Sequence, residues 1–176
     1  GKQNRVEVAE YAFDLEVNLL NLQRELLEES YSPRPYRQFW IRDRKPRLIN
    51  ASSFRDRIAQ HAVMNYLEPE LDKRMIAHSY ACRKGKGVHR AVDFYQKNAR
   101  RYAYVMQLDI RQYFASINHQ ILKTQLNRLI KDKSLLSWLK TVVDSASHPQ
   151  QEGKGLPIGN LVSQYLGNWY LNDVDH

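Results

Sequence analysis

The most informative stretch of the chain begins at residue 104 and reads Tyr104-Val105-Met106-Gln107-Leu108-Asp109-Ile110-Arg111-Gln112-Tyr113-Phe114. Apolar residues alternate over its first half, which predicts a β-strand with one wholly apolar face. Asp109 is expected on the opposite face, at the end of the strand and just before a bulky aromatic turn. A carboxylate held on a rigid sheet can fix divalent metal ions, which stabilise both oxygens of an in-line displacement. Taken alone, Asp109 is better explained as a solvated residue that ends an ordinary strand.

The composition is that of a folded protein with excess positive charge. The chain has 176 residues, of which 43% are hydrophobic and 11% aromatic, enough to bury a core in one domain or two small lobes. Lysine and arginine total 27 against 19 aspartate and glutamate residues, a net charge of +8. This balance favours a polyanionic partner, of which nucleic acid is the commonest, although excess charge also serves solubility.

Cysteine usage and hydropathy exclude two classes of protein. The single cysteine, Cys82, excludes an internal disulfide and a cysteine-based zinc site, so a reducing compartment is expected. Apolar runs are short and the first five residues lack a hydrophobic segment, which predicts a cytoplasmic protein with no membrane span and no signal peptide. The start at Gly1 and the end at His176 are expected to be trimmed rather than natural ends.

The first fifty residues predict a helix and then a hairpin. An apolar stripe at spacings of four and three predicts one long helix over residues 8–26, packed within the molecule rather than as a coiled-coil seam. Pro33 and Pro35 follow the helix and break it. Residues 39–50 read as a short basic hairpin with a charged turn at residues 43–45.

Helices are predicted for most of the remaining chain. Ser53, with Asp56 three residues later, predicts a capped helix start. Residues 79–87 form a basic, glycine-punctuated loop that opens the next helix at Val88. Three further helices are expected, over 118–131, over 133–147 and after Gly159.

Four blocks of the sequence resemble, in the expected order, the motifs of group-II-intron-like reverse transcriptases. The first covers residues 45–60 and begins Lys45-Pro46-Arg47-Leu48-Ile49; the second covers residues 79–89 and includes Tyr80-Ala81-Cys82-Arg83-Lys84-Gly85-Lys86-Gly87. The third is the block around Asp109, and the fourth reads Gly155-Leu156-Pro157-Ile158-Gly159-Asn160-Leu161-Val162-Ser163-Gln164. The resemblance covers most of the chain from about residue 31 onward.

The last block departs from the commoner pattern of this family, in which a glutamine precedes the glycine and a proline follows the serine. Ile158 and Gln164 occupy these two places, which resembles the reverse transcriptases of diversity-generating retroelements. An amide beside the nascent base pair can hydrogen-bond to it, whereas Ile158 offers only shape. Selection against mispairs is therefore expected to weaken, in accord with that family's misincorporation opposite template adenines.

The resemblance implies roles for individual residues. Asp109 would be the catalytic metal ligand, with the Ile110 carbonyl beside it, and the metal would be a pair of Mg²⁺ ions. Phe114 would exclude a ribose 2′-hydroxyl, and Arg47 with Lys45 or Arg42 would hold the triphosphate. The implied deoxynucleotide contacts are Arg42, Lys45, Arg47, Tyr113, Phe114 and Ile158. The implied template and primer contacts are Arg83, Lys84, Lys86, Gly159, Asn160, Ser163 and Gln164. For residues 83–86 a solvated basic loop is an equally good explanation.

The expected fold is α+β, with a mostly helical fingers lobe that carries a small β-hairpin and a partial palm that stops before the family's Tyr-x-Asp-Asp hairpin. Residues 1–100 would form the first part of the fingers and 101–119 the palm strand and turn. Residues 120–154 would form the second part of the fingers and 155–176 a palm helix.

The activity implied by the resemblance is that of an RNA-directed DNA polymerase, with an RNA template, a DNA or RNA primer, deoxynucleotides and a small helical accessory protein as partners. The chain alone is expected to be inactive, because two metal ions about 3.5 to 4 Å apart normally need more than one carboxylate. The alternatives are a group-II-intron-like or phage-defence reverse transcriptase and a nucleic-acid-binding module without polymerase activity. Such a module explains the charge and the basic loop equally well, but not the order of Asp109, Phe114 and Gly159.

Overall fold

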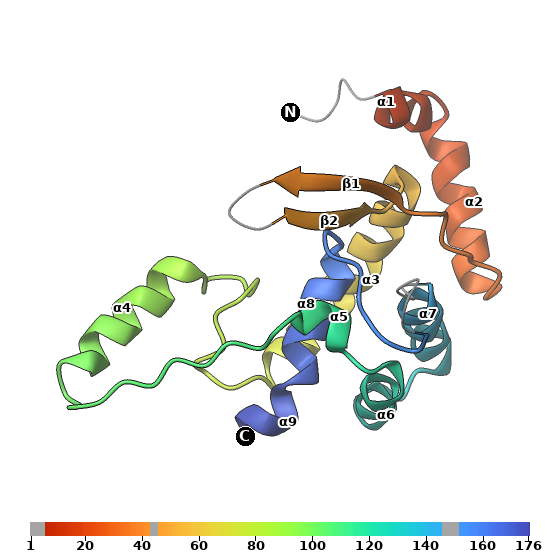
Figure 1. The fold of residues 1–176 in the computed structure, drawn as a ribbon. Helices are drawn as coiled ribbons and strands as arrows, with labels where there is room; N and C mark the ends of the chain where they lie inside the picture. The colour runs from red at the N-terminus through yellow and green to blue at the C-terminus, as the bar shows by residue number, and fades with distance from the viewer. Residues whose placement is uncertain (1–5, 43–45, 146–151) are drawn as a thin grey trace.

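The computed structural model describes residues 6–42, 46–145 and 152–176, and over these ranges it is rich in helices with one two-stranded antiparallel sheet. In chain order the elements are α1 (Val6–Phe13), α2 (Leu15–Leu27), β1 (Arg37–Arg42), β2 (Pro46–Ala51), α3 (Phe54–Asp72), α4 (Val88–Ala99), α5 (Tyr113–Ser116), α6 (His119–Leu129), α7 (Lys133–Asp144), α8 (Leu161–Tyr170) and α9 (Asn172–Asp175). Figure 1 shows the sheet above the first turn of α8, with α5 beside that helix. The expected combination of many helices and one small hairpin is therefore present.

The predicted long N-terminal helix is divided in two, which corrects the sequence-based expectation. Asp14 separates α1 from α2 with non-helical torsions of φ −114° and ψ 47°. Tyr11 and Asn18 exchange two hydrogen bonds across this break, at 3.2 and 3.0 Å. Leu22 is buried, whereas Leu15 is exposed. The apolar stripe continues with the same period of 3.6 residues on both sides of the break, so the period alone does not indicate a bend. Asp14 is a weak helix former, which favours a break at its position.

The predicted hairpin is confirmed by β1 and β2. Their register runs from Arg37 opposite Ala51 to Arg42 opposite Pro46. The turn at residues 43–45 lies outside the described residues. At the base of the hairpin the Asn50 N–H donates to the Ile158 carbonyl at 2.9 Å. This hydrogen bond joins β2 to the turn that precedes α8.

Helix α3 begins at the predicted cap. The Ser53 hydroxyl accepts from the Asp56 N–H at 3.1 Å. The Asp56 carboxylate is 1% exposed and also accepts from the Tyr31 hydroxyl at 2.8 Å and from the Arg34 N–H at 3.0 Å. Burial, together with this carboxylate, raises the pKa of Tyr31 well above its usual range. Asp56 therefore ties the segment between α2 and β1 to α3.

The core lies where α3 and α8 pack against each other, with α6 and α7 beside them. Its largest fully buried side chains include Met64, Leu67, Leu122, Leu139 and Leu166. Each such side chain stabilises the fold by roughly 1.5–3 kcal/mol relative to exposure. The helices predicted over 118–131, over 133–147 and after Gly159 are confirmed as α6, α7 and α8. Within the described ranges, no helix has both the length and the apolar character needed to cross a membrane.

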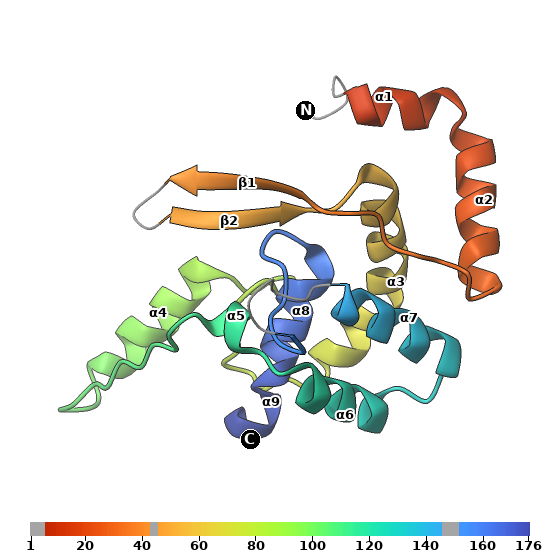
Figure 2. The same ribbon diagram turned by 45° about the vertical axis from the view of Figure 1, so that its right-hand side comes forward.

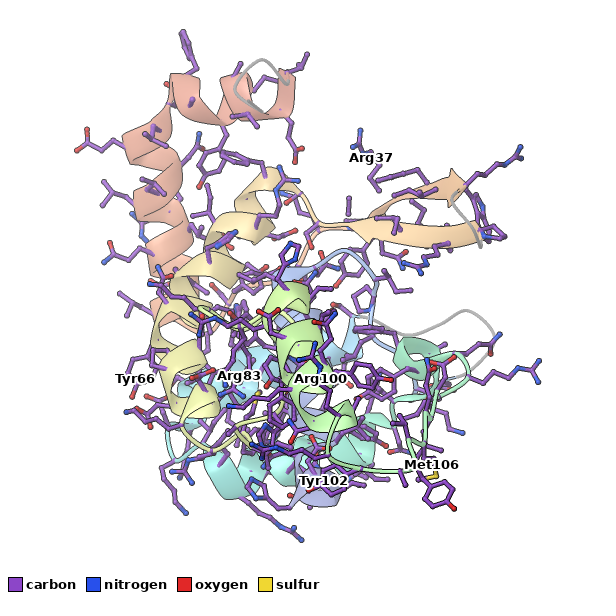
Figure 3. The ribbon with its side chains drawn as sticks, turned by 90° about the vertical axis from the view of Figure 1, so that its left-hand side faces the viewer. Arg37, Tyr66, Arg83, Arg100, Tyr102 and Met106 are labelled. Atoms are coloured by element: carbon purple, nitrogen blue, oxygen red, sulfur yellow. The ribbon has the colours of Figure 1, made fainter. Side chains whose placement is uncertain are left out.

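The predicted strand at residues 104–110 does not form. Its backbone belongs to no regular element, and Tyr104, Met106 and Leu108 are 92%, 79% and 79% exposed. An alternating pattern becomes a strand only beside a partner, and the part of the chain that the structure describes places no second strand there. Figure 3 shows Met106 at the outer edge of the molecule.

The exposed segment continues from α4, and we call residues 88–110 the arm. Helix α4 begins at the predicted glycine loop, with Gly87 as its N-cap, but it buries none of its residues. Figures 1 and 2 both show the arm extending away from the other helices. The predicted helix is confirmed, while its apolar side chains stay largely exposed, although the Phe94 ring stacks on His78 with ring centroids 4.2 Å apart.

Candidate active site

A cleft of about 730 Å³ opens between the hairpin, α5 and the turn before α8. Three parts of the chain supply most of its walls: the hairpin at residues 36–40 and 46–50, residues 111–116, and residues 154–158. Four of the predicted deoxynucleotide contacts line it together, namely Arg47, Tyr113, Phe114 and Ile158. Their convergence joins segments that are more than a hundred residues apart in the sequence.

Hydrogen bonds between main-chain groups hold two of these walls together. The Leu156 N–H donates to the Phe114 carbonyl at 2.8 Å, and the Gly155 N–H donates to the Ile117 carbonyl at 2.8 Å. A bridge between Asn118 and Lys154 continues this antiparallel pairing. The stretch that carries Ile158 is therefore fixed to the stretch that carries Phe114.

The Phe114 ring is placed by a close approach to α8. The Tyr113 hydroxyl donates to the Gly167 carbonyl, and a Cβ atom on Gly167 would lie 3.1 Å from the Phe114 ring. Burial, followed by the nearby Tyr170 and Asp175, raises the pKa of Tyr113 to about 12. Sequence analysis did not identify Gly167, although an isolated glycine inside a helix signals such a close approach.

The cleft is positively charged. Arg47, Arg111 and Lys154 contribute to its lining, and its described lining contains no aspartate or glutamate. Guanidinium and ammonium groups without acidic partners suit an oligophosphate. Arg111 and Lys154 were missed by the sequence analysis, because Arg111 was given no role within the Asp109 block and Lys154 precedes the block that begins at Gly155. Arg111 follows Asp109 by two residues, which is the signal that was overlooked.

Asp109 itself is exposed and is not part of the cleft lining. Asp109 and the Ile110 carbonyl offer oxygen atoms, the ligand type that Mg²⁺ prefers. No group of three or more histidine, cysteine, aspartate or glutamate side chains that could hold a metal occurs among residues 6–42, 46–145 and 152–176. The described residues thus fit part of a magnesium site, with Asp109 and the Ile110 carbonyl as its oxygen ligands. Arg42, at the far end of β1, is also outside the lining, and Lys45 lies outside the described residues.

Comparison with known proteins identifies the family. The family model described as "Reverse transcriptase (RNA-dependent DNA polymerase)" matches residues 41–176, which include the end of β1, all of β2, Asp109, α5 and α8. The chain belongs to the reverse transcriptase family.

Three relatives of this reverse transcriptase chain illustrate its range. It is 30% identical to Protein YkfC of Escherichia coli strain K12 over 174 residues, which are 92% of this chain and 45% of that protein. It is 26% identical to Group II intron-encoded protein LtrA of Lactococcus lactis subsp. cremoris over 157 residues, 85% of this chain and 26% of that protein. It is also 26% identical to the Putative COX1/OXI3 intron 1 protein of Saccharomyces cerevisiae over 136 residues, 74% of this chain and 16% of that protein. The chain spans less than half the length of each.

The basic loop of this reverse transcriptase chain is anchored by Arg83. The Arg83 guanidinium bonds to the Asp72 carboxylate at 2.5 Å and donates to the carbonyls of Ile76 and Ser79 at 2.7 and 2.9 Å. Arg83 is buried, and Figure 3 shows it close to α3. The hydrogen bond from Arg83 lowers the pKa of Asp72 below its ordinary value. These contacts correct the predicted template contact of Arg83 to a structural role.

The two lysines of this loop differ in their freedom. Lys86 donates to the Ala77 carbonyl at 2.6 Å, and its ammonium group lies 5.4 Å from the centre of the Tyr80 ring. Lys84 is exposed. Of the three basic residues predicted to meet the template, Lys84 has the most accessible side chain.

The predicted template contacts around the start of α8 divide in the same way. Asn160 and Ser163 are each 3% exposed, so their side chains are part of the interior. Gly159 is exposed and Gln164 is half-buried. The structure therefore corrects the prediction for Asn160 and Ser163, because an interior side chain cannot contact a template without rearrangement. The Asn160 side chain bonds to the hairpin instead.

Proposed function

We propose that this chain forms the nucleotide-binding part of an RNA-directed DNA polymerase that copies a template RNA in a diversity-generating retroelement. The observation that carries the proposal is the composition of the cleft. Its lining has basic side chains and no acidic ones, the Phe114 ring packs against α8, and the aliphatic Ile158 lies in the turn before that helix. Membership of the reverse transcriptase family supports the reaction class.

In this proposal the three cations of the cleft receive the triphosphate of the incoming nucleotide. Arg47 and Arg111 offer planar forks of donors that match phosphate oxygens, and Lys154 adds a point charge. Phe114 belongs to α5, its ring packs against Gly167 of α8, and in this proposal it contacts the sugar. Because a ring on a rigid support cannot retreat, an added 2′-hydroxyl would collide with it, and deoxynucleotides are favoured.

Ile158 supports assignment to the diversity-generating class. Its side chain is 37% exposed and lines the cleft. An aliphatic group there cannot donate or accept a hydrogen bond, so it cannot stabilise a correctly paired base over a mispaired one by a polar contact. Frequent misincorporation is the expected consequence.

Asp109 and the Ile110 carbonyl would hold Mg²⁺ in the proposed enzyme, and the metal would supply charge stabilisation at the transferring phosphate. Residues 1–176 expressed alone are expected not to extend a primer, since the described residues contain no group of three or more acidic, histidine or cysteine side chains that could hold a metal. In family terms, residues 1–100 and 120–154 are assigned to the fingers, and residues 101–119 and 155–176 to the palm.

The proposal is tested by changing the sugar gate in the full-length protein. Phe114→Val should raise the incorporation of ribonucleotides relative to deoxynucleotides by about tenfold or more, the size that one steric contact contributes to discrimination. Primer extension on an RNA template measures this ratio. Phe13→Val, which alters an exposed ring on α1, is the matched control. An unchanged ratio in Phe114→Val would remove Phe114 from the nucleotide site.

The names of the intron-encoded relatives favour a second candidate, a polymerase of the group II intron type. Ile158→Gln separates the two. In a diversity-generating enzyme the added amide should reduce errors opposite template adenines by about tenfold, the size of one selective polar contact. Sequencing of the cDNA gives the error spectrum. Wild-type cDNA without an excess of errors at adenines would favour the intron type.

A further inference from the structure

Asn160 occupies the N-cap position of α8 but does not cap that helix. An asparagine at this position ordinarily accepts a hydrogen bond from the second or third N–H of its own helix. The Asn160 side chain makes no such bond. It is turned instead towards the hairpin and buried to 3% exposure, so its hydrogen-bonding capacity is used across the fold.

The Asn160 amide bonds to the end of β2 at two points. Its Oδ1 atom accepts from the Ser52 N–H at 3.3 Å and from the Ser52 hydroxyl. Its Nδ2 atom donates to the Asn50 carbonyl at 3.0 Å. A donor on one side and an acceptor on the other fix the orientation of the amide, because the reversed amide would oppose both partners.

A third element joins the same cluster from α3. The Gln60 side chain donates to the Ser52 hydroxyl at 2.9 Å. Gln60, Ser52 and Asn160 are all buried, at 3%, 4% and 3% exposure. Buried hydrogen bonds of this kind are costly to leave unmade, so the cluster resists separation, while the Gln60 Oε1 atom has no partner among the described residues.

The turn between Ile158 and Asn160 is held on its other side by the main chain. The Asn50 N–H donates to the Ile158 carbonyl at 2.9 Å. Gly159 has a φ of +112°, and a Cβ atom there would lie 2.8 Å from the Ile49 side chain. The Ile158 carbonyl and the Asn160 side chain therefore both join this turn to β2, the strand that also places Arg47 at the cleft.

We infer that Asn160 is a positioning residue that fixes Ile158 relative to Arg47, so that it sets nucleotide affinity without touching the nucleotide. This inference rests on the proposed polymerase function. Loss of the Asn160 amide removes the side-chain hydrogen bonds between the turn and the end of β2 and leaves the main-chain bond from Asn50 to Ile158. The turn is then held less firmly, so the positions of Ile158 and Arg47 relative to each other vary more. Displacements of this kind act on binding and alignment more than on the chemical step.

Steady-state incorporation of single nucleotides by the full-length protein tests the inference. Asn160→Ala should raise the KM for the correct deoxynucleotide by about tenfold and change kcat by less than about threefold. Asn160→Asp keeps the acceptor for Ser52 but sets a carboxylate oxygen against the Asn50 carbonyl in a buried site, and should raise KM at least as much as Asn160→Ala. Asn172→Ala, a buried asparagine on α9 away from the cleft lining, is the matched control and should leave KM unchanged.

Hydrogen exchange of the same variants provides a readout that does not depend on activity. In Asn160→Ala the N–H groups of Asn50 and Ser52 should exchange at least about tenfold faster, while core N–H groups of α3 keep their protection. An Asn160→Ala protein with wild-type KM, or with unchanged exchange at Asn50 and Ser52, would overturn the inference. A wild-type protein that extends no primer would instead overturn the proposed function, and the exchange rates would still decide the attachment.

Discussion

The arm and the core of this molecule carry similar apolar patterns and use them differently. In the core, α3, α6, α7 and α8 bury their leucines against one another. In the arm, α4 buries no residue, and the segment after it exposes Tyr104, Met106 and Leu108. A pattern of apolar residues therefore predicts which face of a helix or strand is apolar, whereas the burial of that face depends on whether another element packs against it.

The same contrast separates two kinds of basic residue. Arg83 is buried and bonded to carbonyls and to Asp72, whereas Lys84, its neighbour in sequence, is exposed. Sequence patterns treat both as parts of one basic loop. Mutations that are matched between the tightly packed part and the exposed part can sharpen or break this comparison.

The largest difference is expected between two leucines. Leu166→Ala, in the centre of α8, should lower the free energy of unfolding of residues 1–176 by about 2–5 kcal/mol, because it leaves a cavity in the core. Leu108→Ala, in the arm, should change it by less than about 0.5 kcal/mol. Urea unfolding followed by circular dichroism measures both. A cost above about 2 kcal/mol for Leu108→Ala would mean that the arm is covered in solution, and would break the comparison.

Two glycines with similar backbone geometry give the next effect. Gly87 and Gly159 have φ values of +102° and +112°, and only the second has a neighbour within reach of an added Cβ, Ile49. Gly87→Ala should cost about 1–2 kcal/mol of backbone strain. Gly159→Ala should cost about 2–4 kcal/mol, because the β-branched Ile49 cannot easily move aside. Thermal unfolding measures the difference, and equal costs would show that Ile49 yields.

The neighbouring basic residues give a smaller and qualitatively different pair of effects. Arg83→Ala should lower stability by about 1–2 kcal/mol, since it leaves carbonyls unpaired and removes a partly exposed ion pair. Because Arg83 lowers the pKa of Asp72, the ion-pair contribution is present above the ordinary value of 3.8 and fades as the pH falls through the lowered pKa. Urea unfolding at several pH values checks this dependence.

Lys84→Ala should leave stability unchanged but reduce the salt dependence of RNA binding. One lost phosphate contact lowers the slope of log affinity against log salt concentration by about 0.7–0.9. Fluorescence anisotropy with a labelled RNA gives this slope. Should Arg83→Ala lower the slope instead, Arg83 would meet the template after all.

The smallest effect concerns the Tyr113 hydroxyl. Its pKa is raised from 10.0 to about 12, so its contribution to stability is fully present below pH 10 and is lost as the pH rises towards 12. Tyr113→Phe should cost about 0.5–1.5 kcal/mol at neutral pH through the lost bond to Gly167, and this cost should shrink above pH 10. Stability curves with tyrosinate absorbance measure both, and Tyr104→Phe in the arm controls for the loss of one tyrosine. A cost that does not change with pH would contradict the buried hydroxyl.

The helices and the hairpin were predictable because their signals are local. The cap at Ser53 and Asp56, the proline break and the glycine loop before Val88 each act within a few residues. The failure of residues 104–110 to form the predicted strand could not be foreseen, since a strand needs a neighbouring strand that no local pattern supplies. The break at Asp14 was hidden because the apolar stripe resumes with the same period beyond it.

The cleft was predictable in its motif residues and not in its support. Arg47, Phe114 and Ile158 converge as the resemblance implied. Gly167 and Lys154 were missed, because their importance comes from the main-chain pairing and the ring packing between distant segments. Asn160 was assigned to the template through the resemblance of its block to a family motif, whereas its side chain bonds to the end of β2.

The separation of Ser52 and Asn160 by 108 positions has a consequence for synthesis. At ~5–20 residues per second, a ribosome needs roughly 5–20 s to deliver the second partner after the first. During that interval the nascent hairpin has no attachment to α8, and the main-chain groups of Asn50 and Ser52 bond to water. Slow codons in the stretch that encodes α4 to α7 would lengthen this wait, and faster translation would shorten it.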